Sequence, residues 1–137
     1  MRISTKMRYG LRFMIDVAQN QGDGWLTMKD VAERQGISKK YLEQVVSPLA
    51  DAGLLSVRRG KHGGFRLARP ADEITLADIV SASEDGISLL DCLTCIGVCD
   101  REPQCAARNV WDGMQQALMG YLNEHTLADA IAQAPPQ

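Results

Sequence analysis

TMKDVAERQGISKKYLEQVV, residues 27–46, predicts two short helices joined by a tight turn. Thr27 and Asp30 have the spacing of a capping box, with Asp at the position where Glu or Gln is usual, so one helix should begin there. Gly36 should end that helix, and Ser38 should cap the next one. Two short helices around a turn of this kind are typical of a helix-turn-helix.

The second helix of this pair should have one apolar face and one polar face. Its core positions are Leu42, Val45, Val46 and Leu49. Its polar positions are Ser38, Lys40, Tyr41 and Gln44. Side chains of these polar types suit phosphate and base-edge contacts in a major groove. Pro48 predicts a kink, because proline lacks an amide donor and crowds the carbonyl four residues earlier.

The flanking segments complete a winged helix. An earlier helix should begin after Ser4 or Thr5, because apolar residues recur at helical spacing at Met7, Leu11, Met14, Ile15 and Ala18. Residues 54–58 and 65–69 alternate like two strands. Between them lies the basic, glycine-rich turn Arg59-Gly60-Lys61-His62-Gly63-Gly64. A hairpin directly after a helix-turn-helix is a wing.

The wing should meet the DNA backbone through its cations, which are Arg58, Arg59, Lys61 and Arg66. A lone histidine in a basic hairpin is more often a surface polar residue than a metal ligand, so His62 joins the DNA-facing set. The full set of candidate DNA-binding residues is Arg2, Ser38, Lys40, Tyr41, Glu43, Gln44, Arg58, Arg59, Lys61 and His62.

Charge is divided unevenly along the 137 residues, although the net charge is only −2. Residues 1–70 hold 13 Lys and Arg against 6 Asp and Glu, a balance of +7. Residues 71–137 hold 2 against 11, a balance of −9. A polyanion such as double-stranded DNA would be attracted to the first part and repelled by the second.

Length and composition predict one compact fold, with a DNA-binding region over 1–70 and a sensor and dimerisation region over 71–137. The first residues lack the apolar run of a signal peptide, and no stretch approaches the roughly 18 apolar residues that a membrane helix needs. We therefore expect a cytoplasmic protein without a membrane partner. In a reducing compartment, clustered cysteines are more often ligands or redox sensors than disulfides.

All four cysteines lie within a single segment, at Cys92, Cys95, Cys99 and Cys105. Gly97 and Pro103 predict a loop there, which can wrap one soft metal centre. An iron–sulfur cluster and a structural zinc ion both use four thiolates at comparable spacings. A redox switch of bare thiols is a further alternative.

An enzyme is not expected. The pair Cys92 and Cys95 has the spacing of a thiol oxidoreductase, but no βαβ pattern surrounds it. No Ser/His/Asp set, phosphate-binding glycine loop or histidine-rich metal motif supports catalysis.

The C-terminal region should pair with a second chain. Thr75 and Asp78 predict a short helix, and Thr126 and Asp129 predict another. Between them, a helix over 106–124 should carry an apolar stripe of Val110, Trp111, Met114, Leu118, Tyr121 and Leu122. A stripe of this kind is often part of a chain's own core. Its spacing close to 3.5 residues also suits a helix pair, and other segments already supply the core, so we expect a homodimer.

Several of these segments together resemble the IscR/NsrR/RirA regulators. The similar segments are residues 3–12, 40–44, 59–64 and the cysteine loop. The resemblance implies a dimeric winged-helix transcription factor, and many members of that family carry an iron–sulfur cluster on three loop cysteines. Cys92, Cys99 and Cys105 correspond to those three. Tyr41, Glu43, Gln44 and Arg59 fall where the family contacts or discriminates DNA.

The chain departs from this pattern at the fourth ligand. IscR-type members have a histidine where this chain has Arg108, and NsrR-type members have an aspartate where it has Arg8. We hypothesise that Cys95 is the fourth ligand, which favours a [4Fe–4S] cluster over a [2Fe–2S] cluster, with zinc as the alternative occupant. The sequence thus predicts a mainly α-helical regulator with a small β-hairpin, whose DNA affinity depends on this centre.

Overall fold

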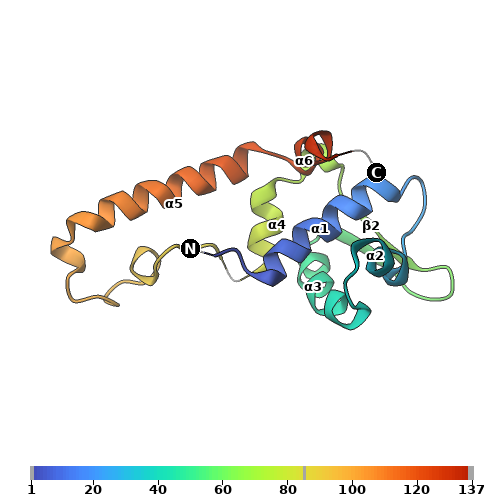
Figure 1. The fold of residues 1–137 in the computed structure, drawn as a ribbon, viewed down its shortest axis with the longest axis horizontal. Helices are drawn as coiled ribbons and strands as arrows, with labels where there is room; N and C mark the ends of the chain where they lie inside the picture. Colours follow the sequence, from blue (N-terminus) through green and yellow to red (C-terminus); the bar gives the residue numbers. More distant parts are fainter. Residues whose placement is uncertain (1, 85, 136–137) are drawn as a thin grey trace.

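The computed structural model describes residues 2–84 and 86–135. Its elements in chain order are α1 (Thr5–Asn20), α2 (Met28–Gln35), α3 (Lys39–Asp51), β1 (Leu55–Arg58), β2 (Gly64–Leu67), η1 (Ala71–Glu73), α4 (Leu76–Ser83), η2 (Asp91–Leu93), η3 (Glu102–Gln104), α5 (Ala106–Glu124) and α6 (Leu127–Gln133). The predicted fold class, mainly helical with one hairpin and a long C-terminal helix, is confirmed. In Figure 1, α1 to α4 and the hairpin form a body from which α5 extends.

Side-chain caps determine where the helices of the body begin. The Ser4 hydroxyl accepts a hydrogen bond from the Met7 amide at 3.1 Å, and the Ser38 hydroxyl accepts one from the Tyr41 amide at 3.2 Å. Capping boxes of Thr and Asp open α2, α4 and α6, as the sequence predicts. Gly36 ends α2 at a φ of 64°, a left-handed conformation that glycine adopts without steric cost. α3 continues through Pro48 to Asp51.

The hairpin is tied to the connection between α1 and α2. β1 and β2 pair antiparallel, from Leu55 opposite Leu67 to Arg58 opposite Gly64. Leu26 and Phe65 exchange two backbone hydrogen bonds, at 2.9 and 2.7 Å. A Cβ atom at Gly64 would collide with the Leu26 backbone, so glycine is required at the start of β2.

One hydrophobic core joins elements from both ends of the chain. Its buried members include Phe13, Met14 and Val17 of α1, Leu42 and Leu49 of α3, Ile79 of α4 and Leu127 of α6. Thr75 and Thr126 form an antiparallel bridge. Beside it, the Leu76 amide donates to the His125 carbonyl at 2.9 Å, and the Leu127 amide donates to the Ile74 carbonyl at 2.8 Å. The C-terminal end of α5 is therefore anchored in the body.

The rest of α5 projects from the body (Figure 1). Much of its apolar stripe is exposed, but Leu118 is half-buried and Leu122 packs against the core. None of its residues is buried. Val110 is 60% exposed, Met114 is 44% exposed and Tyr121 is 52% exposed. Gln115 attaches the preceding segment to this helix, because its side chain bonds the Leu89 amide at 2.9 Å and the Ile87 carbonyl at 2.5 Å. Among the described residues, no helix is long and apolar enough to span a membrane.

Candidate DNA interface and cysteine loop

The polar face of α3 is exposed as predicted. Lys40, Glu43 and Gln44 are exposed on this helix. The Ser38 hydroxyl already accepts the Tyr41 amide as a cap, so its free capacity is a second lone pair and its O–H donor. All four of these side chains can therefore still bond to a phosphate or a base edge.

Tyr41 has a second role, which the sequence did not indicate. It is half-buried, and its ring meets the ring of Tyr9 edge-on, with the centroids 5.5 Å apart. Two guanidinium groups of α1 lie near the Tyr9 ring, Arg12 at 5.2 Å and Arg8 at 5.9 Å from the centroid. The aromatic pair therefore fixes the N-terminal part of α3 against α1 beside a cluster of cations.

In the wing, Arg59, Lys61 and His62 are exposed around the hairpin turn. The other two wing arginines share one aromatic partner. Arg58 lies 5.8 Å and Arg66 lies 5.5 Å from the ring centroid of Trp25. Trp25 belongs to the connection between α1 and α2, so it reaches the hairpin only in the folded chain. No local sequence motif predicts this contact.

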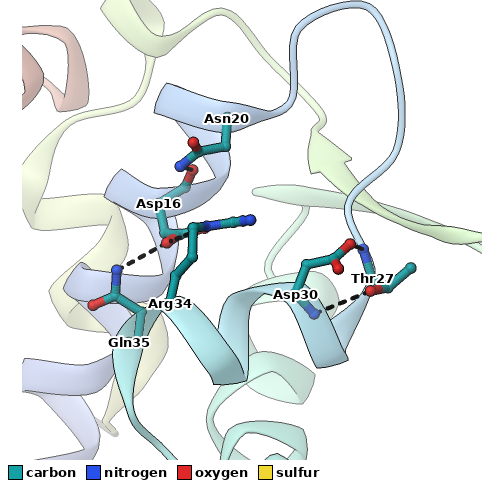
Figure 2. Close-up of polar contacts among 6 residues, drawn as sticks. All are labelled: Asp16, Asn20, Thr27, Asp30, Arg34 and Gln35. Atoms are coloured by element: carbon teal, nitrogen blue, oxygen red, sulfur yellow. Dashed lines mark hydrogen bonds and ion pairs between the residues drawn. The ribbon is translucent and has the colours of Figure 1, made fainter. Parts of the chain in front are cut away.

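A buried carboxylate holds α2 against α1 (Figure 2). The Asp16 side chain is fully buried and receives Arg34 at 2.6 Å, with further bonds at 3.1 and 3.2 Å. Gln35 donates to the same carboxylate at 2.8 Å, while Arg12 donates to the Gln35 side chain and carbonyl at 3.0 and 2.6 Å. The bond to Asp16 raises the pKa of Arg34. This network fixes the last turn of α2, which leads through Gly36 into α3.

Arg2 lies apart from these groups. It is exposed in the segment before α1 and lines a hollow with Ile3, Glu84 and Gly86. Figure 1 shows the N-terminal segment beside the loop that precedes α5.

The cysteine loop runs between α4 and α5 and contains the short turns η2 and η3. All four thiols are free; Cys95 and Cys99 are exposed, while Cys92 and Cys105 are half-buried. Within residues 2–84 and 86–135, no three His, Cys, Asp or Glu side chains are grouped to hold one metal ion. Binding of such a centre would therefore require the loop to close further around it.

Cys99 and Cys105 do line one common hollow of about 840 Å³, together with Glu102 and Arg108. The Nε atom of this arginine is buried without a hydrogen-bond partner. Four free thiols supply the donors that iron–sulfur clusters and zinc take, and a buried guanidinium N–H offers a bond to an acceptor. In donor chemistry and number, the residues present thus fit a sulfur-ligated centre.

Comparison with known proteins identifies the family. Residues 3–133 match the family model described as "Rrf2: Iron-dependent Transcriptional regulator". The chain belongs to the Rrf2 family. It is 37% identical to Protein rrf2 of Nitratidesulfovibrio vulgaris over 134 residues, which cover 98% of this chain and 89% of that protein. It is 36% identical to IscR of Klebsiella pneumoniae over 131 residues, covering 96% and 80% of the two chains.

Solved structures of Rrf2-type regulators have the same fold. CymR of Bacillus subtilis, described as the global cysteine regulator of that organism, gives a TM-score of 0.82 at 36% identity and covers 98% of this chain and 99% of its own. IscR of T. potens gives 0.78 at 32% identity, covering 100% and 94%. The predicted resemblance is confirmed: the chain is a transcriptional regulator of the Rrf2 family, whose members bind DNA.

Proposed function

We propose that this Rrf2 regulator binds DNA as a homodimer and that an iron–sulfur cluster on its cysteine loop controls its affinity. The observation that carries the proposal is the position of the loop. Cys105 directly precedes α5, and the other three cysteines lie within the preceding thirteen residues. The family description, an iron-dependent regulator, supports iron as the metal.

Residues 1–70 form the DNA-binding region in this proposal. α3 enters the major groove with Lys40, Glu43 and Gln44 on its exposed face. Wing cations contact phosphates, and the positive balance of this region attracts the duplex. Trp25 holds Arg58 and Arg66 on one side of the hairpin, which limits the directions in which they can reach DNA.

Residues 71–137 form the sensor and the dimer contact. The exposed part of the α5 stripe includes Val110, Trp111 and Met114, each at least 40% exposed. Large apolar side chains gathered on one projecting helix are typical of an interface with another chain. A second copy is the favoured partner, because two recognition helices about 34 Å apart can enter successive major grooves.

Cys92, Cys95, Cys99 and Cys105 would hold the cluster, with Cys95 in place of the missing histidine. When bound, the cluster supplies a centre that responds to iron supply, oxygen or nitric oxide. The chain's own part is mechanical: the loop leads into α5, so a change in loop conformation alters how α5 is oriented. A coupling of a few kcal/mol between the two sites suffices for regulation.

A second candidate is a thiol–disulfide sensor. The exposure of Cys95 and Cys99 favours it, since accessible thiols are open to oxidation. One solved relative is an oxidized form of Staphylococcus aureus CymR, with a TM-score of 0.78 at 35% identity. Structural zinc is the remaining alternative.

Anaerobic purification followed by iron and sulfide analysis distinguishes these candidates. The cluster proposal expects a coloured protein with both elements, whereas zinc gives a colourless protein and the thiol sensor gives no metal. A gel-shift assay with and without the cluster then measures the coupling to DNA. Equal affinity in both states, or a metal-free wild-type protein, would overturn the proposal.

The role of Cys95 needs its own variant. Cys95→Ser should change the anaerobic absorbance and resonance Raman spectra, because one thiolate ligand is lost. An unchanged spectrum would remove Cys95 from the ligand set and leave Asp91, Asp100 or Glu102 as oxygen-ligand candidates.

A further inference from the structure

Arg108 ties the cysteine loop to the first turn of α5. Its Nη2 atom donates to the Cys92 carbonyl at 3.2 Å and lies 3.6 Å from Glu102 Oε1. The other oxygen of Glu102 accepts the Gly97 amide at 3.0 Å. We call this set of contacts the Arg108 clasp; its members are Cys92, Gly97, Glu102 and Arg108.

The clasp contacts the loop at three points, at the first cysteine and then at two residues that lie between later cysteines. It bonds the backbone of Cys92, then Gly97 between Cys95 and Cys99, and then Glu102 before Cys105. Gly97 has a φ of 82°, which favours glycine at the point where the chain turns toward Glu102. These few contacts therefore guide the backbone on both sides of the two exposed thiols.

The guanidinium also has an unused donor. Arg108 Nε is buried without a partner, while other atoms of the same side chain line the hollow shared with Cys99 and Cys105. A buried N–H without an acceptor is unfavourable, and an anionic sulfur brought against it when the loop closes would satisfy it.

We propose that Arg108 is a positioning residue for the sensor: it holds the loop on α5 through the clasp and directs Nε–H toward a sulfur atom of the bound centre. The second half of this inference rests on the proposed function, because it requires a sulfur-ligated centre. The first half does not, because the clasp joins groups of the polypeptide alone. Arg108 thereby connects the state of the loop to the helix that carries the dimer stripe.

Amide exchange in the metal-free, full-length protein tests the clasp. Glu102→Ala removes the acceptor of Gly97, and Arg108→Gln removes the group that orients Glu102. Both should speed exchange of the Gly97 amide by about two- to tenfold, the loss of one hydrogen bond. Arg101→Gln, an exposed arginine in the same loop, is the matched control and should exchange like wild type. Wild-type exchange in both test variants would overturn the clasp.

The rate of cluster loss under a fixed chelator tests the donor to sulfur. Arg108→Gln should lose iron about tenfold faster or more, the usual effect of removing a group that bonds a metal ligand. Arg108→Lys keeps the charge without the fork and should fall between, and it decides the test if Arg108→Gln does not fold. Arg101→Gln should match wild type. Wild-type loss rates in both Arg108 variants would refute the donor.

The two failures can be told apart. A wild-type protein that takes up no iron and sulfide overturns the proposed function and the sulfur contact together. The exchange of Gly97 then still decides whether the Arg108 clasp exists.

Discussion

Asp16 on α1 and Arg34 on α2 form an ion pair in which the Asp16 side chain is fully buried while the Arg34 side chain is 35% exposed. Loss of one partner therefore has a different effect from loss of the other. Water can solvate Arg34 if Asp16 is lost, but nothing except Gln35 would remain to donate to the Asp16 side chain if Arg34 were lost.

This difference in burial predicts which variant loses more free energy of unfolding. Arg34→Ala should lower the free energy of unfolding by about 3 kcal/mol, because it leaves a buried carboxylate without its cation. Asp16→Asn should cost less, about 2 kcal/mol, because it removes the buried charge, although its NH2 group then faces a donor that a carboxylate oxygen had accepted. Urea unfolding of both variants measures the difference, and the reverse order would show that the buried charge is not the dominant cost.

Replacing Trp25 should lower DNA affinity without changing the number of protein cations that contact phosphates. Trp25→Ala removes the ring beside Arg58 and Arg66, and we expect affinity to fall about three- to tenfold from the lost orientation. The slope of log affinity against log salt should stay the same, because no cation is removed. Arg58→Ala should instead reduce that slope by about 1. Trp25→Phe retains an aromatic face and is the control; a changed slope in Trp25→Ala would contradict this account.

A charge in the stripe of α5 should separate the proposed dimer. Met114→Glu is expected to raise the dimer dissociation constant by about thirtyfold or more. The folded monomer should tolerate the change, since Met114 is 44% exposed in a single chain. Asn123→Glu, at another exposed position of the same helix, adds the same charge outside the stripe and should leave the dimer intact. Analytical ultracentrifugation of both variants measures their dimer dissociation constants. Equal constants would show that the interface lies elsewhere.

Asp129 predicts a pH dependence at α6. Hydrogen bonds from the Thr126 amide and from the cap hydroxyl lower the pKa of Asp129 below its ordinary value. The stabilisation is therefore complete above the ordinary aspartate pKa of about 3.9 and is lost as the pH falls through the lower folded-state pKa. Wild type should be more stable than Asp129→Asn at pH 7, and the gap should narrow toward pH 3 in urea unfolding. A gap that widens in acid would contradict the sign.

Local signals in the sequence predicted the elements well. Each capping box spans three residues, so the pairs Thr27 with Asp30 and Thr75 with Asp78 could be read directly from spacing. The hairpin was also predicted, with its strands displaced by one or two residues. Pro48, where a kink is predicted, lies inside α3, which continues for three more residues.

Contacts between distant residues could not be predicted in this way. Asp16 fell on the helix predicted from apolar spacing, but its partner is 18 residues away on another element. The placement of Trp25 over the wing likewise depends on how α1, α2 and the hairpin pack. Such side-chain pairs are decided by tertiary packing and leave no periodic signal.

The cysteine loop shows the same limit at the site itself. Spacing identified the four thiols, but the structure shows Cys99 and Cys105 on one hollow and no group of three ligands among the described residues. The sequence identifies Arg108 only as the residue at the position where IscR-type members have a histidine. Its bonds to Cys92 and Glu102 became visible only in three dimensions.

The bridge between Thr75 and Thr126 makes α5 a lever arm with its fulcrum in the DNA-reading body. Its 19 residues span roughly 28 Å, so a tilt of roughly 5° about the fixed end displaces the cysteine end by about 2.5 Å. The same geometry works in reverse. A displacement of a few ångströms at the loop becomes a small rotation of the body, and with it of α3, the proposed recognition helix.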